Sequence, residues 1–384
     1  MDEIMDVLTR GVSEVLPDKE GLAKLMASKK IRLYQGFDPS MPSLHLGNFV
    51  GLMKLRQFQK LGHEVIFLVG DFTGMIGDPT DKLSSRKKLT REQVLSNAKS
   101  WKEQAGRLLD FDGPNAAKFM FNSEWSDKLS FKELIETTSN FTVQQMIERD
   151  MFQKRLKENK PIYLHEFLYP VAQAIDCVEM GVDLEIGGSD QVFNMLAGRT
   201  LMKAVKNREK YVLATKLLVD KDGNKVGKTT GNALFLDSTA SNFYAGIMSF
   251  PDEVLPLSFE LLTELPLEVI EDKVKKDPMG EKKRLAFEVV KLLWGNNAAV
   301  GAETDFKQTF QEKEPEFTLP IKIEGGLDES ICPHLVNPTV SEAKRLINAG
   351  SVEVNGKVVK DRNFQLNEDD KIRIGKLIFG TATK

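Results

Sequence analysis

Apolar residues near the N-terminus follow two spacings in turn, which predict a strand, a helix and a second strand. Residues 31–35 form a short apolar run that ends in a polar turn. From residue 46 to about 60, apolar side chains recur every three or four positions, as on one face of a helix. Residues 64–69 are a continuous apolar run bounded by Gly70, which is typical of a buried strand. This order indicates a βαβ unit and therefore a parallel sheet with both faces covered.

A second part of the same sheet is predicted downstream. Residues 182–186 are predicted to form another strand, and residues 187–191 then open a helix. Residues from about 85 to 165 have the spacing of helices with charged faces. We therefore expect them to be a helical insertion into the sheet domain.

The sequence pattern of the C-terminal half predicts helices followed by a separate module. Residues 242–313 have helical spacing, most clearly at 281–295, where Gly295 is the expected stop. The apolar side of that helix is predicted to hold Leu285, Val289, Leu292 and Leu293. Residues 314–320 carry a proline near each end, as a linker does, and a compact module follows from about residue 332.

Length and composition favour a soluble protein of two to three domains. The chain has 384 residues, and no apolar run approaches the roughly 20 residues that span a bilayer. Its N-terminus is acidic and lacks the layout of a signal peptide. We therefore predict a cytoplasmic protein without a membrane contact. Cys177 and Cys332 are its two cysteines and lie in different predicted domains, which disfavours a disulfide.

Net charge does not indicate a nucleic-acid binder, but its distribution does. The formal net charge of the whole chain is −3. The last fifty residues instead hold nine Lys or Arg and six Asp or Glu, a net +3 by count. Local positive charge on a folded module suits a phosphate backbone, although a solvated amphipathic helix would give the same pattern. The positive cluster consists of Lys344, Arg345, Lys357, Lys360 and Arg362.

The tetrapeptide His45-Leu46-Gly47-Asn48, which we call the HLGN motif, stands where the first helix begins. The N-terminus of a helix attracts anions, because its N–H groups lack partners and its dipole is positive there. Gly47 permits close approach of the backbone, and His45 and Asn48 can both donate to phosphate oxygens. A capped helix with a surface histidine would look the same, so the motif is weak alone.

The segment Lys225-Val226-Gly227-Lys228-Thr229, which we call the KVGKT motif, is the second element that suits phosphate. Asp222-Gly223 predicts a turn just before it. Two lysines in a polar loop could neutralise the charge that develops on a leaving pyrophosphate. A solvated basic loop is the alternative explanation.

Three further features carry polar groups to the edge of the predicted sheet. Tyr169, Gln173 and Asp176 lie at i, i+4 and i+7, so they share one face of a helix that is otherwise apolar. Pro170 predicts a helix start or a kink beside Tyr169. The strand that ends at Gly187-Gly188 is followed by Asp190, which suits a ribose. Asp78 follows the second strand and could bind an ammonium group. Each feature also has an ordinary explanation, as a solvent face or a turn.

These motifs, in this order, resemble the bacterial-type tyrosyl-tRNA synthetases, a family of class I aminoacyl-tRNA synthetases, over nearly the whole chain. The resemblance is carried by Tyr34 to Ser40, by the segment 70–80, by Tyr169-Pro170 with Gln173 and Asp176, and by 187–191. Residues 341–356 resemble an S4-type RNA-binding module. Departures from the family pattern are Asn48 for His, Val226-Gly227 for Met-Ser, and Trp294-Gly295 for His-Gly.

The resemblance implies an α/β fold in three parts. A Rossmann-like doubly wound parallel sheet would occupy 1–240, with the helical insertion at about 85–165 and the signature loop at about 221–232. A small all-α domain on the anticodon side would occupy 241–320. A C-terminal α+β S4-like module would occupy 331–384.

The resemblance also implies a role for each matching residue. The tyrosine site would consist of Tyr34, Asp78, Tyr169, Gln173, Asp176 and Gln191. The ATP site would consist of Asp38, Ser40, His45, Gly47, Asn48, Gly188, Asp190 and Lys228. The groups around the pyrophosphate would be His45, Asn48, Lys82, Arg86, Lys225, Lys228 and Thr229. The implied reaction forms tyrosyl-adenylate from L-tyrosine and ATP, with Mg²⁺ on the ATP, and then charges tRNA(Tyr), with no covalent enzyme intermediate. A homodimer built through the inserted helices is implied as well.

Three alternatives remain at this stage. The tryptophan enzyme shares the sheet domain, but Tyr34, Asp176 and the S4-like tail disfavour it. An RNA-binding relative without catalysis is disfavoured by His45, Asp78 and the two lysines of the KVGKT motif. A general nucleotidyltransferase would explain the phosphate motifs but not the Tyr169–Asp176 face.

Overall fold

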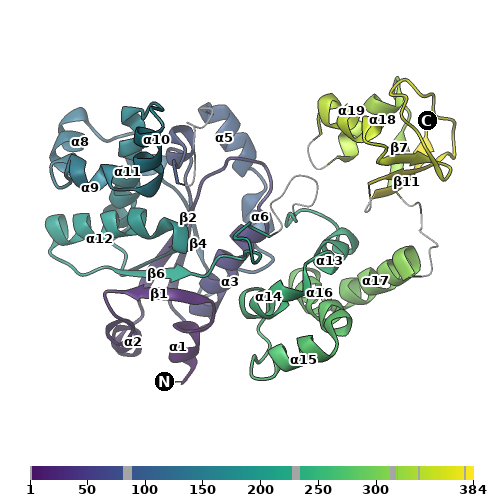
Figure 1. The fold of residues 1–384 in the computed structure, drawn as a ribbon. Coiled ribbons are helices and arrows are strands. Elements are labelled where there is room, and N and C mark those ends of the chain that lie inside the picture. The colour runs from purple at the N-terminus through teal and green to yellow at the C-terminus, as the bar shows by residue number, and fades with distance from the viewer. Residues whose placement is uncertain are drawn as a thin grey trace. The chain divides into compact units, whose positions relative to one another are not determined.

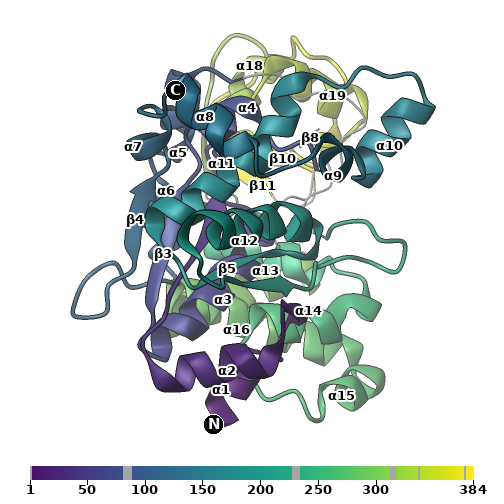
Figure 2. The ribbon, with the colours of Figure 1, turned by 90° about the vertical axis from the view of Figure 1, so that its left-hand side faces the viewer.

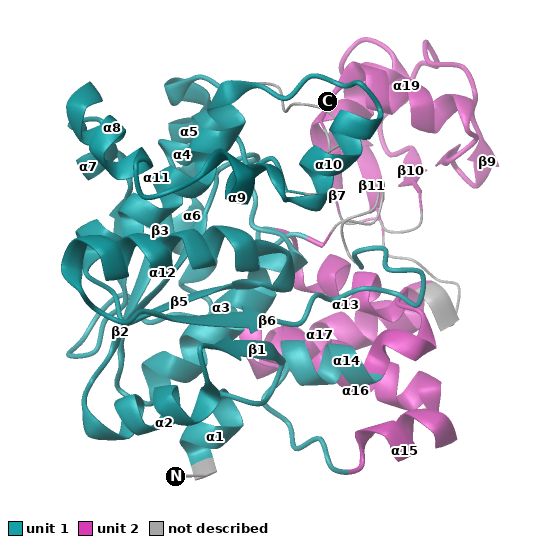
Figure 3. Ribbon diagram, turned by 60° about the vertical axis from the view of Figure 1, so that its left-hand side comes forward, with its two compact units in different colours: residues 1–226, 235–237, 256–268 teal, residues 227–234, 238–255, 269–384 magenta. Residues whose placement is uncertain are grey.

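The computed structural model describes residues 2–80, 89–226, 234–311, 317, 319–335, 338–375 and 378–384 (Figure 1). The chain divides into two compact units. Unit 1 comprises residues 1–226, 235–237 and 256–268, and unit 2 comprises 227–234, 238–255 and 269–384 (Figure 3). No helix in these described ranges has both the length and the apolar character needed to cross a membrane.

Unit 1 is built on a six-stranded sheet in the order β1-β6-β5-β2-β3-β4. Five strands are parallel, as predicted, whereas β1 runs antiparallel to β6 and makes the sheet mixed. The prediction of a purely parallel sheet is therefore wrong at this edge. The strand bounds are β1 Val12–Leu16, β2 Arg32–Phe37, β3 Glu64–Val69, β4 Lys118–Phe121, β5 Leu184–Gly188 and β6 Tyr211–Thr215.

Two crossovers leave the centre of this sheet in opposite directions. Strand β2 leads through α3 (Leu46–Lys60) to β3, and its neighbour β5 leads through α12 (Val192–Lys206) to β6. Because such crossovers are right-handed, opposite directions place α3 and α12 on opposite faces of the sheet, as Figure 2 shows. The border between β2 and β5 is therefore a topological switch point, where open α/β sheets bind ligands beyond the carboxyl ends of their strands.

The segment between the two halves is mostly helical. Its helices are α5 Arg91–Ala98, α6 Trp101–Ala105, α7 Ser123–Ser126, α8 Phe131–Thr138, α9 Val143–Ile147 and α10 Asp150–Lys157. The prediction of a wholly helical insertion is wrong at 118–121, where β4 pairs with β3. Four residues at a sheet edge are too few to show a strand spacing.

The other helices of unit 1 frame the sheet. They are α1 Asp2–Val7, α2 Lys19–Ser28, α4 Thr73–Ile76 and α11 Leu164–Met180. Helix α11 passes through Pro170 and begins six residues before it, so the expected helix start at this proline is wrong. The core between α11 and the sheet contains Tyr34, Leu68, Cys177 and Met202. Both cysteines of the chain are free thiols.

The first part of unit 2 is helical, as predicted. Its helices are α13 Ala240–Met248, α15 Ile270–Lys276, α16 Pro278–Trp294 and α17 Asn296–Phe306, and α14 Leu255–Leu262 lies largely in unit 1. Leu285, Val289 and Leu293 of α16 are buried, and Gly295 follows the helix as its cap with φ of 87°. Trp294 stacks edge-on against Phe243, with the ring centroids 5.3 Å apart.

The C-terminal part of unit 2 is a five-stranded sheet with two short helices. Its strands run in the order β7-β11-β10-β8-β9. The bounds are β7 Leu319–Lys322, β8 Val352–Val354, β9 Lys357–Val358, β10 Lys371–Ile374, β11 Ile378–Thr383, α18 Leu327–Ile331 and α19 Val340–Asn348. Strand β7 pairs with β11, so Leu319 and Pro320 belong to this module and not to the predicted linker.

Candidate active site

Predicted site residues gather at the carboxyl ends of β2, β3 and β5, at the switch point. Asp38 directly follows β2, Asp78 lies beyond β3 and α4, and Gly188 ends β5. On helix α11, Tyr169 donates to Asp38 and Gln173 donates to Glu185 of β5, while Asp176 accepts from Trp125 of α7. Tyr169 and Asp176 are buried, so this face of α11 is not a solvent face.

Asp38 is held by two hydroxyl groups. Tyr169 donates to Oδ2 of Asp38 at 2.8 Å, and Thr73 donates to Oδ1 at 2.6 Å. Gly70 makes room for the second bond, because a Cβ there would stand 2.1 Å from Oδ1 of Asp38. The carboxylate assigned to ATP is therefore joined to the residue assigned to the ammonium group of tyrosine.

Asp176 is a buried carboxyl group with two neutral donors. Nε1 of Trp125 donates to Oδ1 at 2.7 Å, and Nδ2 of Asn122 donates to Oδ2 at 3.3 Å. Burial raises the pKa of Asp176 well above its usual range. Glu185 and Asp38 add to this increase, and the two hydrogen bonds oppose it.

Tyr34 is buried beside Asp176, on β2. Its hydroxyl donates to Oε1 of Glu185 at 2.5 Å and lies 3.1 Å from Sγ of Cys177. Burial, together with the nearby Cys177, Glu185 and Asp176, raises the pKa of Tyr34 well above its ordinary value, so its hydroxyl stays protonated. Gln173 donates to the same Oε1 of Glu185 at 2.8 Å.

Asp78 and Gln191 contact each other directly. Nε2 of Gln191 donates to Oδ2 of Asp78 at 2.8 Å, while Thr80 donates to Oδ1 through its backbone and its hydroxyl. Asn194 holds Oε1 of Gln191 at 2.9 Å. The loops after β3 and β5 are thus joined by two residues that were both assigned to tyrosine.

The HLGN motif forms a reciprocal cap at the start of α3. The backbone N–H of Asn48 donates to Nδ1 of His45 at 3.3 Å, and that of His45 donates to Oδ1 of Asn48 at 2.9 Å. Because Nδ1 accepts, the neutral ring carries its proton on Nε2, where it can donate to a ligand. Asn48 likewise keeps its Nδ2 group as a donor.

Lys225 of the KVGKT motif contacts the ribose loop, and Phe235, further along the chain, contacts the HLGN motif. Nζ of Lys225 lies 2.7 Å from Oδ2 of Asp190, and Phe235 forms an antiparallel bridge with His45. The backbone of Leu236 also donates to the carbonyl of Leu44 at 2.8 Å. Among the other predicted residues, Ser40 is exposed, and Lys82, Arg86, Lys228 and Thr229 lie outside the described residues.

Known proteins resemble this chain over nearly its whole length. The family model of class I tRNA synthetases (W and Y) matches residues 26–311, and the S4 domain model matches 327–372. The chain is 40% identical to the tyrosine–tRNA ligase of Carboxydothermus hydrogenoformans, covering 98% of this chain and 96% of that one. It is also 40% identical to the enzyme of Aquifex aeolicus, covering 98% of both chains.

The chain belongs to the tyrosine–tRNA ligase family of class I synthetases. A C-terminally truncated mitochondrial tyrosyl-tRNA synthetase of Coccidioides posadasii shares its fold with a TM-score of 0.66. That structure is 25% identical and covers 79% of this chain and 91% of its own. The fold expected of this family, with its C-terminal S4 module, is thereby confirmed.

The structure adds four tyrosine–tRNA ligase residues that the sequence patterns did not single out. Asn122 and Trp125 hold Asp176 but come from α7 and the turn before it, where no spacing points to a pocket. Glu185 accepts from the hydroxyl of Tyr34, and Lys210 pairs with Glu185. Glu185 could have been found, because it is a charged residue inside the apolar strand 182–186.

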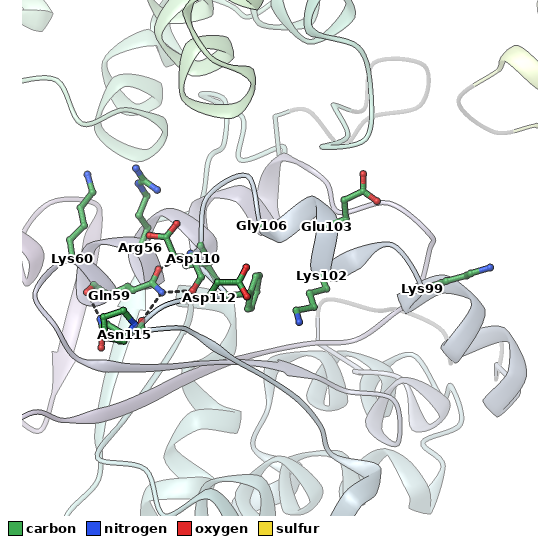
Figure 4. Close-up of a pocket in the computed structure, with 13 residues that line it drawn as sticks. Arg56, Gln59, Lys60, Lys99, Lys102, Glu103, Gly106, Asp110, Asp112 and Asn115 are labelled. Atoms are coloured by element: carbon green, nitrogen blue, oxygen red, sulfur yellow. Dashed lines mark hydrogen bonds between the residues drawn. The ribbon is translucent and has the colours of Figure 1, made fainter.

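A cavity of about 830 Å³ lies elsewhere in unit 1, against the end of α3 and α6 (Figure 4). None of the predicted site residues lines it. Its charged lining consists of the cations Arg56, Lys60, Lys99 and Lys102 and the anions Glu103, Asp110 and Asp112, and Arg56 and Lys60 are paired with Glu264. Within the described ranges, no group of three or more His, Cys, Asp or Glu side chains could hold a metal ion.

Proposed function

We propose that the residues at the switch point bind L-tyrosine and ATP and join them as tyrosyl-adenylate, before tyrosine passes to the 3′ end of tRNA(Tyr). The observation that carries this proposal is a set of hydrogen bonds at the switch point, in which Tyr169 donates to Asp38, Tyr34 and Gln173 donate to Glu185, and Gln191 donates to Asp78. Membership of the tyrosine–tRNA ligase family supports the same reaction.

The amino-acid side of the site follows from the polar contacts. Tyr34 and Asp176 would meet the phenol hydroxyl of tyrosine, because both are buried polar groups at one end of α11 and β2. The α-ammonium group suits the acidic end of the site, where Asp78, Tyr169 and Gln173 would hold it, with Gln191 near the carboxylate. A hydroxylated ring would give these buried groups a further hydrogen-bond partner, which phenylalanine lacks.

The nucleotide side follows from the helix start and the loops. ATP would lie against Asp38, Ser40, Gly47 and the HLGN side chains, with its ribose at Gly188 and Asp190. The tyrosine carboxylate attacks the α-phosphorus, and pyrophosphate leaves. Nε2 of His45, Nδ2 of Asn48 and the ammonium of Lys225 would stabilise the charge that develops, together with Lys82, Arg86, Lys228 and Thr229. Mg²⁺ would enter on the ATP.

The transfer step needs no covalent bond between the enzyme and tyrosine. A ribose hydroxyl at the 3′ end of the tRNA attacks the carbonyl carbon of the adenylate, and AMP leaves. Arg345, Lys357, Lys360 and Arg362 are exposed on the S4 module and would contact the phosphates of the tRNA. We expect the protein to work in the cytoplasm with the tRNA pool.

The deciding experiment is ATP–pyrophosphate exchange with each of the twenty amino acids. We expect exchange with tyrosine alone, followed by charging of tRNA(Tyr) in total bacterial tRNA. Exchange with tryptophan would favour the related tryptophan enzyme. RNA binding without exchange for any amino acid would contradict the proposal.

Exposed apolar side chains on the inserted helices support the proposed homodimer. Phe131 is 78% exposed and Ile135 54% exposed, one turn apart on α8. Val143 on α9 is 71% exposed, and Leu164 at the start of α11 is 78% exposed. Exposed large apolar side chains are common at protein interfaces, and a closed symmetric pair of subunits would cover them.

Replacing Phe131 and Leu164 by glutamate is therefore expected to shift the protein from dimer to monomer, because charges would be buried without partners in the interface. Sedimentation velocity at micromolar concentration measures the change. Val205→Glu is the matched control, since Val205 is exposed on α12, outside the inserted helices. A wild-type protein that sediments as a monomer would rule out the dimer.

A further inference from the structure

Glu185 is a buried carboxylate with four donors around it, outside the roles assigned so far. It lies on β5 and is 1% exposed. Oε1 accepts from the hydroxyl of Tyr34 at 2.5 Å and from Nε2 of Gln173 at 2.8 Å. Oε2 accepts from Sγ of Cys177 at 3.2 Å and from Nζ of Lys210. The two oxygens of a carboxylate can accept all four bonds, two at each oxygen.

Lys210 balances this charge inside the protein. It has no exposed surface, and its Nζ also donates to the carbonyl of Met195 at 2.8 Å. A buried ion pair adds little net stability, because both charges lose their hydration. Two apolar residues would fill the same space at least as well. The pair therefore calls for an explanation other than stability.

The explanation lies in the single proton of the Tyr34 hydroxyl. The high pKa of this buried phenol keeps the proton in place. Glu185, at 2.5 Å, is a much closer acceptor for it than the sulfur of Cys177 at 3.1 Å. A hydroxyl group that donates its proton to one neighbour can only accept from another.

We propose that Glu185, neutralised by Lys210, holds the hydroxyl proton of Tyr34 and thereby makes Oη of Tyr34 an acceptor towards the ring substituent of the bound amino acid. Glu185 is then a positioning residue that sets which substituents the site prefers. This inference rests on the proposed placement of tyrosine against Tyr34 and Asp176.

The consequence is a site with two acceptors at the end of the aromatic ring, Oη of Tyr34 and the carboxylate of Asp176. A phenol has one proton, which it can donate to only one of the two acceptors. The amino group of 4-aminophenylalanine has two protons, one for each acceptor. We therefore expect the wild-type protein to bind 4-aminophenylalanine within about tenfold of tyrosine and far better than phenylalanine.

The test is the ratio of the dissociation constants of 4-aminophenylalanine and tyrosine, measured by equilibrium dialysis without ATP. In Glu185→Gln, Lys210 would bind the amide oxygen, so the amide NH₂ group would face Tyr34. The hydroxyl of Tyr34 could then no longer donate to residue 185 and would donate its proton to the ligand instead. The ratio should rise on the order of tenfold, which corresponds to about 1.4 kcal/mol. If this variant does not fold, Glu185→Leu with Lys210→Met removes the ion pair as a whole and should raise the ratio in the same way.

Two further variants separate the possible causes. In a Tyr34→Phe background, Glu185→Gln should leave the ratio unchanged, because no proton remains to be redirected. Arg155→Met with Glu166→Leu is the matched control, since this pair is also buried, at 1% and 3% side-chain exposure, and does not contact Tyr34. It should leave the ratio at the wild-type value.

The outcomes are distinguishable. Parallel weakening of both ligands in the Glu185 variants, with an unchanged ratio, overturns the inference and leaves Glu185 a structural residue. Wild-type protein that binds 4-aminophenylalanine no better than phenylalanine overturns it as well. If Tyr34→Phe does not alter the preference for tyrosine over phenylalanine, the proposed tyrosine site itself is wrong.

Discussion

Replacing Asp176 by alanine is expected to raise the dissociation constant for tyrosine about a hundredfold, a change of about 2.7 kcal/mol. The substitution removes a buried carboxyl group that would face the phenol hydroxyl, and it also leaves Nε1 of Trp125 and Nδ2 of Asn122 without their acceptor. Equilibrium dialysis with tyrosine measures the affinity. The KM for ATP in pyrophosphate exchange should change little, because the nucleotide lies at the other end of the site.

The matched control is Asp183→Ala. Asp183 is also a largely buried aspartate of unit 1, but it precedes β5 and binds Lys29, Arg208 and the backbone of Arg32. These contacts lie at the amino ends of the strands, away from the switch point. Asp183→Ala should lower the melting temperature and leave tyrosine affinity unchanged. Equal tyrosine affinity in wild type and Asp176→Ala would refute the assignment of Asp176.

Asparagine at position 176 is not a conservative replacement here. Both oxygens of Asp176 accept hydrogen bonds from protein donors, and an amide has only one oxygen. Its NH₂ group would face either Trp125 or Asn122, donor against donor. Asp176→Asn should therefore weaken tyrosine binding about as much as Asp176→Ala does. If the site required only the shape of the aspartate side chain, Asp176→Asn would keep the wild-type affinity.

Spacing along the chain was sufficient to predict the parts of the fold that repeat. Helix α3 and strand β3 have the bounds that their apolar patterns predict, and Gly295 ends α16 as expected. The same reasoning missed β4 and the antiparallel β1, because edge strands are short and need only one well-covered partner. The helix start predicted at Pro170 is wrong, because α11 contains this proline in its interior.

The residues of the candidate site also divide into those that spacing along the chain predicts and those that it does not. Tyr169, Gln173 and Asp176 could be grouped from sequence because one helix face brings them together. Their pairing with Asp38 and Asn122 could not be predicted, because these two residues reach them from distant positions in the chain. Long-range pairing depends on the order of the strands in the sheet, and local sequence patterns do not predict this order.

Removing residues 312–384 is expected to preserve tyrosine-dependent pyrophosphate exchange within about twofold and to lower kcat/KM for tRNA charging at least a hundredfold. The tyrosine and ATP residues proposed above all lie before this cut. The removed module carries the exposed cations that suit a phosphate backbone, and their loss removes that part of the binding free energy. The cut precedes β7, because a chain ending near 325 would keep this strand without β11, its partner in the sheet.

Charge can be separated from fold within the full-length chain. Changing Lys357, Lys360 and Arg362 to glutamine keeps the buried core of the module, which includes Ile347 and Ile372, untouched. This variant should raise the KM for tRNA and make it less sensitive to salt, because fewer counterions are released on binding. Exchange should remain at the wild-type rate. If truncation lowers exchange and charging equally, the C-terminal module supports the catalytic fold, and its proposed role in binding tRNA is refuted.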